Sequence, residues 1–142
     1  VNLVIMYYIK LIMKNTIFRL LEYLYYFSLV ILFILYLFPG SLIGFLLYDN
    51  LSKQPDLIPN PIGTSINHLI SFIYISSLAF IVRVRKKKFI SSFQFLFITS
   101  IILEILHNFI PNRAFEYYDL FANIMGVIFT YLLIQLILKI KN

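Results

Sequence analysis

Long apolar runs are the feature that most constrains the fold of this chain. Residues 20–38, 65–82, 89–110 and 118–138 carry few charges, and each run is close to the about 20 residues that an α-helix needs to cross a bilayer. No stretch of about ten residues alternates at a period of two, as a membrane barrel requires. Since 61% of the 142 residues are hydrophobic and 13% are charged, we predict an all-α, polytopic membrane protein: a four-transmembrane-helix bundle.

Proline and glycine mark the connections between these runs. Pro39 and Gly40 end the first run, and the Gly40–Gly44 spacing indicates a bend or an interfacial turn. Residues 49–64 contain three prolines and are predicted to form an exposed loop. Pro111 is predicted to end the third helix.

The first 19 residues form a basic and apolar lead to the first run. The apolar run 1–12 is too short to span a bilayer and is expected to lie in the interface. Alternatively, Met13 is the natural start and the lead is not native. Residues 20–142 are predicted to form the four-helix membrane domain.

The basic residues alternate between the ends of the predicted helices. The N-terminal flank carries three, the 49–64 loop one, the 83–88 connection five, the 107–118 connection one and the C-terminal flank two. The positive-inside rule therefore predicts cytoplasmic N- and C-termini and a multi-pass protein of the cell membrane. The net charge of +6 is thus assigned to membrane topology, and no nucleic-acid partner is expected.

The residue types also limit the chemistry. The chain has no cysteine, which excludes disulfides, thiolate metal ligands and cysteine nucleophiles. Two isolated histidines give no spacing typical of an imidazole metal site. No cofactor and no metal are predicted.

The most unusual stretch runs from Glu104 to Gly126, between the last two apolar runs. Glu104 and His107 are three residues apart and share a helix face, and Asp119 and Asn123 share a face of the next helix. Arg113 lies in the connection, where it is predicted to bridge the two carboxylates. Both polar faces are expected to meet at the outer boundary of the membrane.

Several of these residues have a second interpretation. The acids and Arg113 form either a binding site or a purely structural ion-pair cap of the hairpin. His107 is a ligand or catalytic base, or simply hydrated, and Asn123 contacts a ligand or joins two helices. His68, at the same end of the second apolar run, is a further candidate for the cluster. Gly126 is predicted to let a neighbouring backbone approach closely.

At these residues the chain resembles the VanZ-like family of small multi-helix membrane proteins. The resemblance is carried by Glu104, His107, Phe109, Pro111, Arg113, Asp119, Asn123 and Gly126. It extends more weakly over residues 20–138. That family commonly opens its second helix with Asp-Lys and a histidine three residues later, whereas this chain has Asn67, His68 and Ser71 at those positions.

These observations are compatible with three functions. The first is an envelope protein whose polar cluster binds a lipid headgroup, a lipid-linked envelope precursor or a glycopeptide; the resemblance implies an effect on teicoplanin susceptibility. The second is a membrane-embedded enzyme acting on a lipid-linked or phosphorylated envelope substrate, with Arg113 holding the anion and Glu104 or His107 as general acid or base. The third, proton-coupled transport, ranks last because few polar residues are expected at mid-depth.

Overall fold

The structure is a computed structural model that describes the backbone of residues 2–55 and 65–141 and the side chains of residues 14–55 and 65–140. In these residues it is all-α, with helices α1 (Asn2–Leu37), α2 (Leu42–Tyr48), α3 (Ser65–Arg85), α4 (Phe93–Leu106) and α5 (Tyr117–Lys141). Short 3-10 turns flank α4 at Phe89–Ser91 and His107–Phe109.

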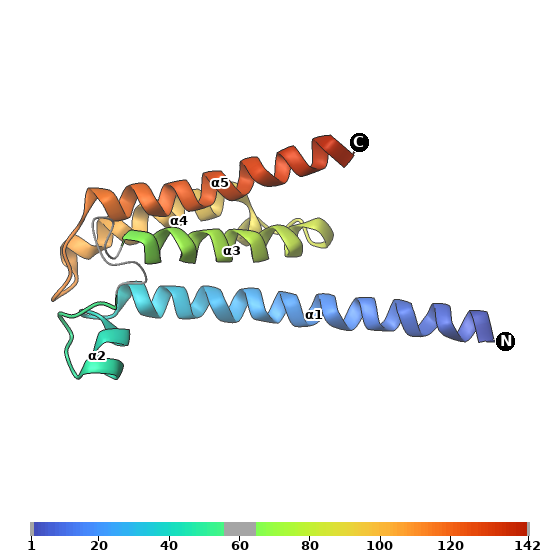
Figure 1. The fold of residues 1–142 in the computed structure, drawn as a ribbon, viewed down its shortest axis with the longest axis horizontal. Helices are drawn as coiled ribbons and strands as arrows, with labels where there is room; N and C mark the ends of the chain where they lie inside the picture. Colours follow the sequence, from blue (N-terminus) through green and yellow to red (C-terminus); the bar gives the residue numbers. More distant parts are fainter. Residues whose placement is uncertain (1, 56–64, 142) are drawn as a thin grey trace.

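Four of the helices run side by side and alternate in direction (Figure 1). Helix α3 packs against α5 over the longest shared surface, and α1 contacts α3 and α4. Both termini lie at one end of the bundle, and α2 and the α4–α5 connection lie at the other (Figure 1). We call these the terminal end and the loop end.

Three helices are long and apolar enough to cross a membrane: residues Lys14–Leu37, Ser65–Arg85 and Tyr117–Ile140. Their outward faces carry many exposed Leu, Ile, Phe and Tyr side chains, as expected for surfaces that meet lipid. The membrane class and the multi-pass arrangement predicted from the sequence are therefore supported.

The predicted spanning helix 89–110 is wrong in its detail. Helix α4 covers only 14 residues, about 21 Å, whereas the hydrocarbon core is about 30 Å thick. Two serines explain the late start, since Ser91 Oγ donates to the Lys88 carbonyl and Ser92 Oγ accepts from the Phe95 N–H. Both bonds favour a turn and an N-cap over a continuous helix.

The connection after α1 also differs from the expected bend. Leu42–Tyr48 form a short helix that Ser41 caps through the Gly44 N–H. A Cβ on Gly44 would lie 1.6 Å from the Lys53 carbonyl oxygen, so only glycine allows this connection to fold back on itself. Of the predicted 49–64 loop, residues 56–64 lie outside the described part.

Residues 2–19 of the lead belong to the same helix as the first apolar run. The backbone of α1 is continuous from Asn2 to Leu37, so no helix boundary separates residues 19 and 20. Which residue starts the native chain stays a prediction.

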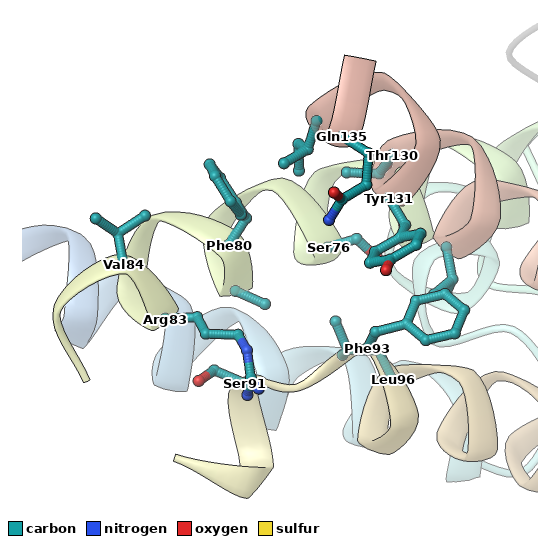
Figure 2. Close-up of a pocket in the computed structure, with 13 residues that line it drawn as sticks. Ser76, Phe80, Arg83, Val84, Ser91, Phe93, Leu96, Thr130, Tyr131 and Gln135 are labelled. Atoms are coloured by element: carbon teal, nitrogen blue, oxygen red, sulfur yellow. The ribbon is translucent and has the colours of Figure 1, made fainter. Parts of the chain in front are cut away.

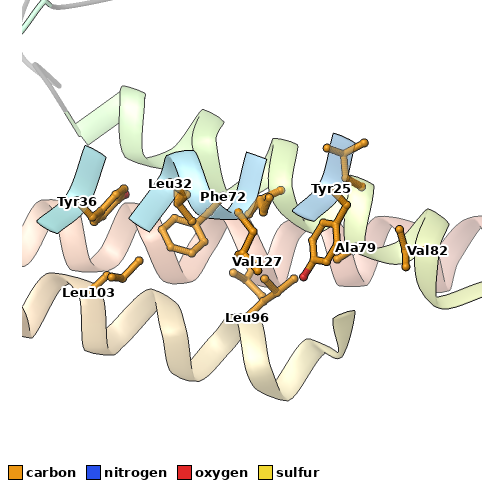
Figure 3. Close-up of a cluster of buried hydrophobic side chains, with 12 residues drawn as sticks. Tyr25, Leu32, Tyr36, Phe72, Ala79, Val82, Leu96, Leu103 and Val127 are labelled. Carbon is orange, nitrogen blue, oxygen red and sulfur yellow. The ribbon is translucent and has the colours of Figure 1, made fainter. Parts of the chain in front are cut away.

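The bundle core is apolar over most of its length. Figure 3 shows Tyr36 and Leu103 towards one end of this core and Tyr25 and Val82 towards the other. Buried small residues, among them Ala79, allow the close helix contacts on which packing in a membrane depends. The prediction for Gly126 is confirmed, because a Cβ there would lie 2.8 Å from the Leu69 carbonyl oxygen on α3.

The basic cluster after α3 is tied to α1 at the terminal end. Lys86 Nζ lies 2.7 Å from a Glu22 carboxylate oxygen, and Lys88 Nζ lies 3.9 Å from the other oxygen. Glu22 exposes only 7% of its surface, so its charge needs these partners. This pairing explains the single acid in the first apolar run.

Candidate functional site

The loop end of the bundle contains a buried polar cluster, which we call the His–carboxylate cluster: His68, Glu104, His107, Asp119 and Asn123. Glu104 and Asn123 are fully buried, and each of the other three exposes at most 7% of its surface. The structure therefore brings together residues from α3, α4, α5 and the turn that follows α4. The cluster points into the bundle at its loop end; that this end faces the outer side of the membrane stays a prediction.

Glu104 and His107 form one acid–base pair of this cluster. His107 Nδ1 lies 3.2 Å from Glu104 Oε1, and His107 Nε2 lies 3.1 Å from the carbonyl oxygen of Tyr36. The backbone N–H of Glu116 also donates to Glu104 Oε1, at 3.2 Å. Because a carbonyl oxygen only accepts, Nε2 carries a proton, and Nδ1 carries a second one if Glu104 is ionised.

His68 and Asp119 form the second acid–base pair. His68 Nε2 lies 3.4 Å from Asp119 Oδ2, and Ser65 Oγ donates to the other oxygen, Asp119 Oδ1. His68 Nδ1 lies 3.7 Å from Glu104 Oε2. Each carboxylate thus has a histidine nitrogen within 3.4 Å.

Asn123 and Tyr36 connect the two pairs. The Asn123 side-chain amide donates to Glu104 Oε2 at 3.3 Å and to the Ser100 carbonyl at 3.4 Å. Tyr36 Oη donates to Asn123 Oδ1 at 2.7 Å and lies 2.9 Å from His68 Nδ1. Asn123 therefore joins helices, as one of the two predictions has it, and also orients the cluster.

Arg113 does not bridge Glu104 and Asp119, so that prediction is wrong. Its Nη2 donates to the Leu35 carbonyl at 2.6 Å and its Nε donates to the Phe38 carbonyl at 3.4 Å. The last carbonyl groups of a helix have no hydrogen-bond partners within that helix. At the end of α1, Arg113 and His107 are the partners of these carbonyl groups. The competition from these carbonyls explains why the guanidinium stays away from the acids.

Burial and nearby charges shift the pKa values of Arg113 and Glu116 in the α4–α5 connection. Burial lowers the pKa of Arg113, while the charges of Glu104 and Asp119 oppose this shift. Burial, followed by repulsion from Asp119 and Glu104, raises the pKa of Glu116. The negative charges of Glu104 and Asp119 therefore act on both groups, after burial.

An open pocket lies beside the cluster at the loop end. It has a volume of about 430 Å³ and is lined by Ser52, Gln54, His107, Asn112, Arg113, Ala114, Glu116 and Asp119. A smaller neighbour of about 90 Å³ is lined in part by Tyr36, His68 and Arg113. Both cavities give access from outside the bundle to residues of the cluster.

The site contains two residues that the sequence analysis did not predict, and two residues predicted to act in helix packing lie outside the cluster. Tyr36 and Ser65 were missed, although both lie at the predicted outer ends of their apolar runs, which was the available signal. Pro111 ends the α4 segment but is exposed in a turn, so it takes no part in helix packing there. Gly126 lies in the α3–α5 contact, beyond the cluster.

A different cavity of about 220 Å³ lies at the terminal end, and Figure 2 shows Arg83, Ser91, Phe93 and Gln135 around it. Its lining is mostly apolar, and it has no acid among its lining residues. The loop end is therefore the better candidate for chemistry.

Three side chains of the cluster could also act as ligands of a metal ion. His68, Glu104 and Asp119 each offer one ligand atom, and these atoms lie within 4.8 Å of one another. The sequence spacing gave no sign of this set, because the three residues come from three different helices.

Comparison of the chain with protein-family models, with curated proteins and with solved structures found no match.

Proposed function

We propose that this chain is a multi-pass membrane protein of the VanZ-like type that binds the polar headgroup of a lipid or of a lipid-linked envelope precursor. The bundle crosses the membrane four times, the fourth crossing being α4 with its flanking turns, and the loop end faces outwards. The observation that carries the proposal is the polar pocket of about 430 Å³ at the loop end. Its lining contrasts with the apolar exterior of the helices.

The pocket offers groups of both charges to a ligand. Arg113 is permanently cationic and has five N–H donors, of which two are used by carbonyls at the end of α1. Glu116 and Asp119 supply negative charge on the other side of the lining. This arrangement suits a headgroup that carries a phosphate and an amine.

The resemblance to the VanZ-like family extends this proposal to glycopeptide susceptibility. Teicoplanin carries a lipid tail and acts at the membrane surface, where a protein that occupies a lipid-linked precursor would change access to it. Glu104, Arg113, Asp119 and Asn123 carry both the resemblance and the geometry of the loop end.

A second candidate is an enzyme acting on the same class of substrate. It is favoured by the Glu104–His107 pair, which is hydrogen-bonded at 3.2 Å next to a pocket that His107 and Arg113 line. Arg113 would hold an anionic group and the pair would transfer a proton. The substitution Glu104→Gln separates the two functions, because it abolishes proton transfer and only weakens binding.

The test is native mass spectrometry of the protein purified in a mild detergent, with identification of the lipids and precursors that remain bound. We expect a bound species in the wild type that is lost from Arg113→Gln and reduced in Glu116→Gln. Arg19→Gln removes an exposed charge at the terminal end and is the matched control, which should keep the species.

Stability has to be measured on the same samples, since Arg113 also donates to carbonyls at the end of α1. The Glu116 side chain makes no such bond among the described residues, so Glu116→Gln tests the pocket independently. Equal amounts of the bound species in all four proteins would refute the proposal.

A further inference from the structure

We propose that His68, Glu104 and Asp119 form a binding site for one divalent transition-metal ion of the zinc class. The three side chains come from α3, α4 and α5, and their ligand atoms lie within 4.8 Å of one another. All three residues expose at most 7% of their surface. A set of one imidazole and two carboxylates is typical of such ions.

The hydrogen bonds fix which nitrogen of His68 is left for a ligand. The Asn123 amide nitrogen faces two acceptors, Glu104 Oε2 and the Ser100 carbonyl, so Asn123 Oδ1 is the atom that faces Tyr36. Tyr36 Oη has one proton and donates it to this oxygen. Its lone pair therefore accepts from His68 Nδ1–H, at 2.9 Å.

This assignment leaves His68 Nε2 facing Asp119 Oδ2 at 3.4 Å. Neither atom takes part in a hydrogen bond with any residue that the structure describes. In neutral His68 the Nε2 atom carries a lone pair, which repels the facing carboxylate oxygen unless a proton or a metal ion lies between them. A metal ion supplies that cation while His68 stays neutral.

The remaining atoms of the ligands are held by a second layer of partners. Asp119 Oδ1 accepts from Ser65 Oγ, and Glu104 Oε1 accepts from the Glu116 N–H and lies 3.2 Å from His107 Nδ1. Partners of this kind orient the ligands of protein metal sites and fix their tautomers. His68 and Asp119 thus each have one restrained atom and one atom that faces the other residue, at 3.4 Å. Glu104 Oε2 accepts from the Asn123 amide at 3.3 Å.

The ligand atoms need to move only a short distance to coordinate one ion. The 3.4 Å between His68 Nε2 and Asp119 Oδ2 is about the separation of two ligands on a tetrahedral ion with bonds of about 2.0–2.1 Å. A ligand atom 4.8 Å from another has to move by at most about 1.5 Å to reach the same separation. Rotation of a carboxylate about its side-chain torsions covers this distance.

Electrostatics and access agree with this site. Two buried carboxylates carry a charge that a divalent ion neutralises, which lowers the cost of burying them. Asp119 lines the larger pocket and His68 the smaller one, so the ion has an entry path. The inference does not rest on headgroup binding, because a metal is measured without any lipid ligand.

The test is titration of the detergent-purified, chelator-treated full chain with Zn²⁺ by calorimetry and with Co²⁺ by visible absorption. We expect one ion per chain, with cobalt bands typical of nitrogen and oxygen ligands. Asp119→Asn and His68→Gln should each weaken the affinity at least about 100-fold, and Tyr36→Phe about 10-fold through the orientation of His68.

The matched control is Asp49→Asn, an exposed acid in a left-handed conformation that asparagine adopts equally well. It should bind as the wild type does. If the wild type binds no ion, or if Asp119→Asn and His68→Gln bind as tightly as Asp49→Asn does, the site does not exist. A variant that loses its helical circular dichroism is replaced by Tyr36→Phe, whose unchanged affinity would equally overturn the assignment of His68.

Discussion

The hydroxyl of Tyr36 provides a sensitive test of the His–carboxylate cluster. Tyr36→Phe removes one oxygen that makes two contacts, a donated bond to Asn123 Oδ1 at 2.7 Å and an accepted one from His68 Nδ1 at 2.9 Å. The ring keeps its neighbours, since it stacks on His107 with centroids 5.6 Å apart. The substitution therefore isolates the polar contribution.

The expected cost follows from these contacts. A hydrogen bond between membrane helices contributes about 0.6 kcal/mol on average and up to about 1.7 kcal/mol, so two bonds contribute about 1–2 kcal/mol. The two groups left behind do not become isolated, because His68 Nδ1 and Asn123 Oδ1 lie 3.2 Å apart. We therefore expect a loss of about 1–2 kcal/mol in the free energy of unfolding.

The measurement is unfolding in mild-detergent micelles by titration with sodium dodecyl sulfate, followed by far-ultraviolet circular dichroism. Tyr74→Phe is the matched control, since its hydroxyl makes one exposed hydrogen bond to Ser28 Oγ and should contribute less than about 0.5 kcal/mol. Equal stability of Tyr36→Phe and Tyr74→Phe would refute the proton assignment and the cluster that depends on it.

Three further outcomes are expected from the packing and charges. Gly126→Ala should lower the free energy of unfolding by about 1–3 kcal/mol, measured in the same titration, because its methyl group meets the α3 backbone; an unchanged midpoint contradicts this contact. Lys86→Gln should lower the free energy of unfolding by about 0.5–1 kcal/mol, since half-exposed Lys86 pairs with Glu22. The same substitution should have a smaller effect when it is made in the Glu22→Gln variant. Glu116 has a raised pKa, so its stabilising contribution is present below its unfolded pKa and lost as the pH rises through the folded one; Glu116→Gln should therefore gain stability relative to wild type from about pH 4 upwards, and parallel pH profiles would contradict it.

The sequence predicts the helical membrane class because apolar runs of bilayer length form few structures other than membrane-spanning helices. It also predicts which end of the bundle is polar, since Glu104, Asp119 and Asn123 are too costly to place in lipid. Helix α2 and the shortened α4 were missed because they depend on local bonds of Ser41, Ser91 and Ser92 that no hydrophobic pattern reveals.

The hydrogen-bond partners within and around the cluster could not be predicted from the sequence, for a different reason. Arg113 had two sets of acceptors, the acids and the last carbonyls of α1, and only the packing of α1 against the loop end decides between them. The sequence did not distinguish Tyr36 from the many other aromatic residues, which were expected to face lipid. The choice of partner at such positions depends on tertiary contacts, which spacing along a helix does not report.

The proposed function requires that the pocket beside the His–carboxylate cluster opens at the outer face of the membrane. Because the chain has no cysteine, single cysteines at Ala114, which lines the pocket, and at exposed Lys87 report their own location. The measurement is labelling of intact cells with a membrane-impermeant maleimide. We expect Ala114→Cys to react in intact cells and Lys87→Cys to react only after permeabilisation; the reverse pattern would place the pocket on the cytoplasmic side and contradict binding of an envelope component.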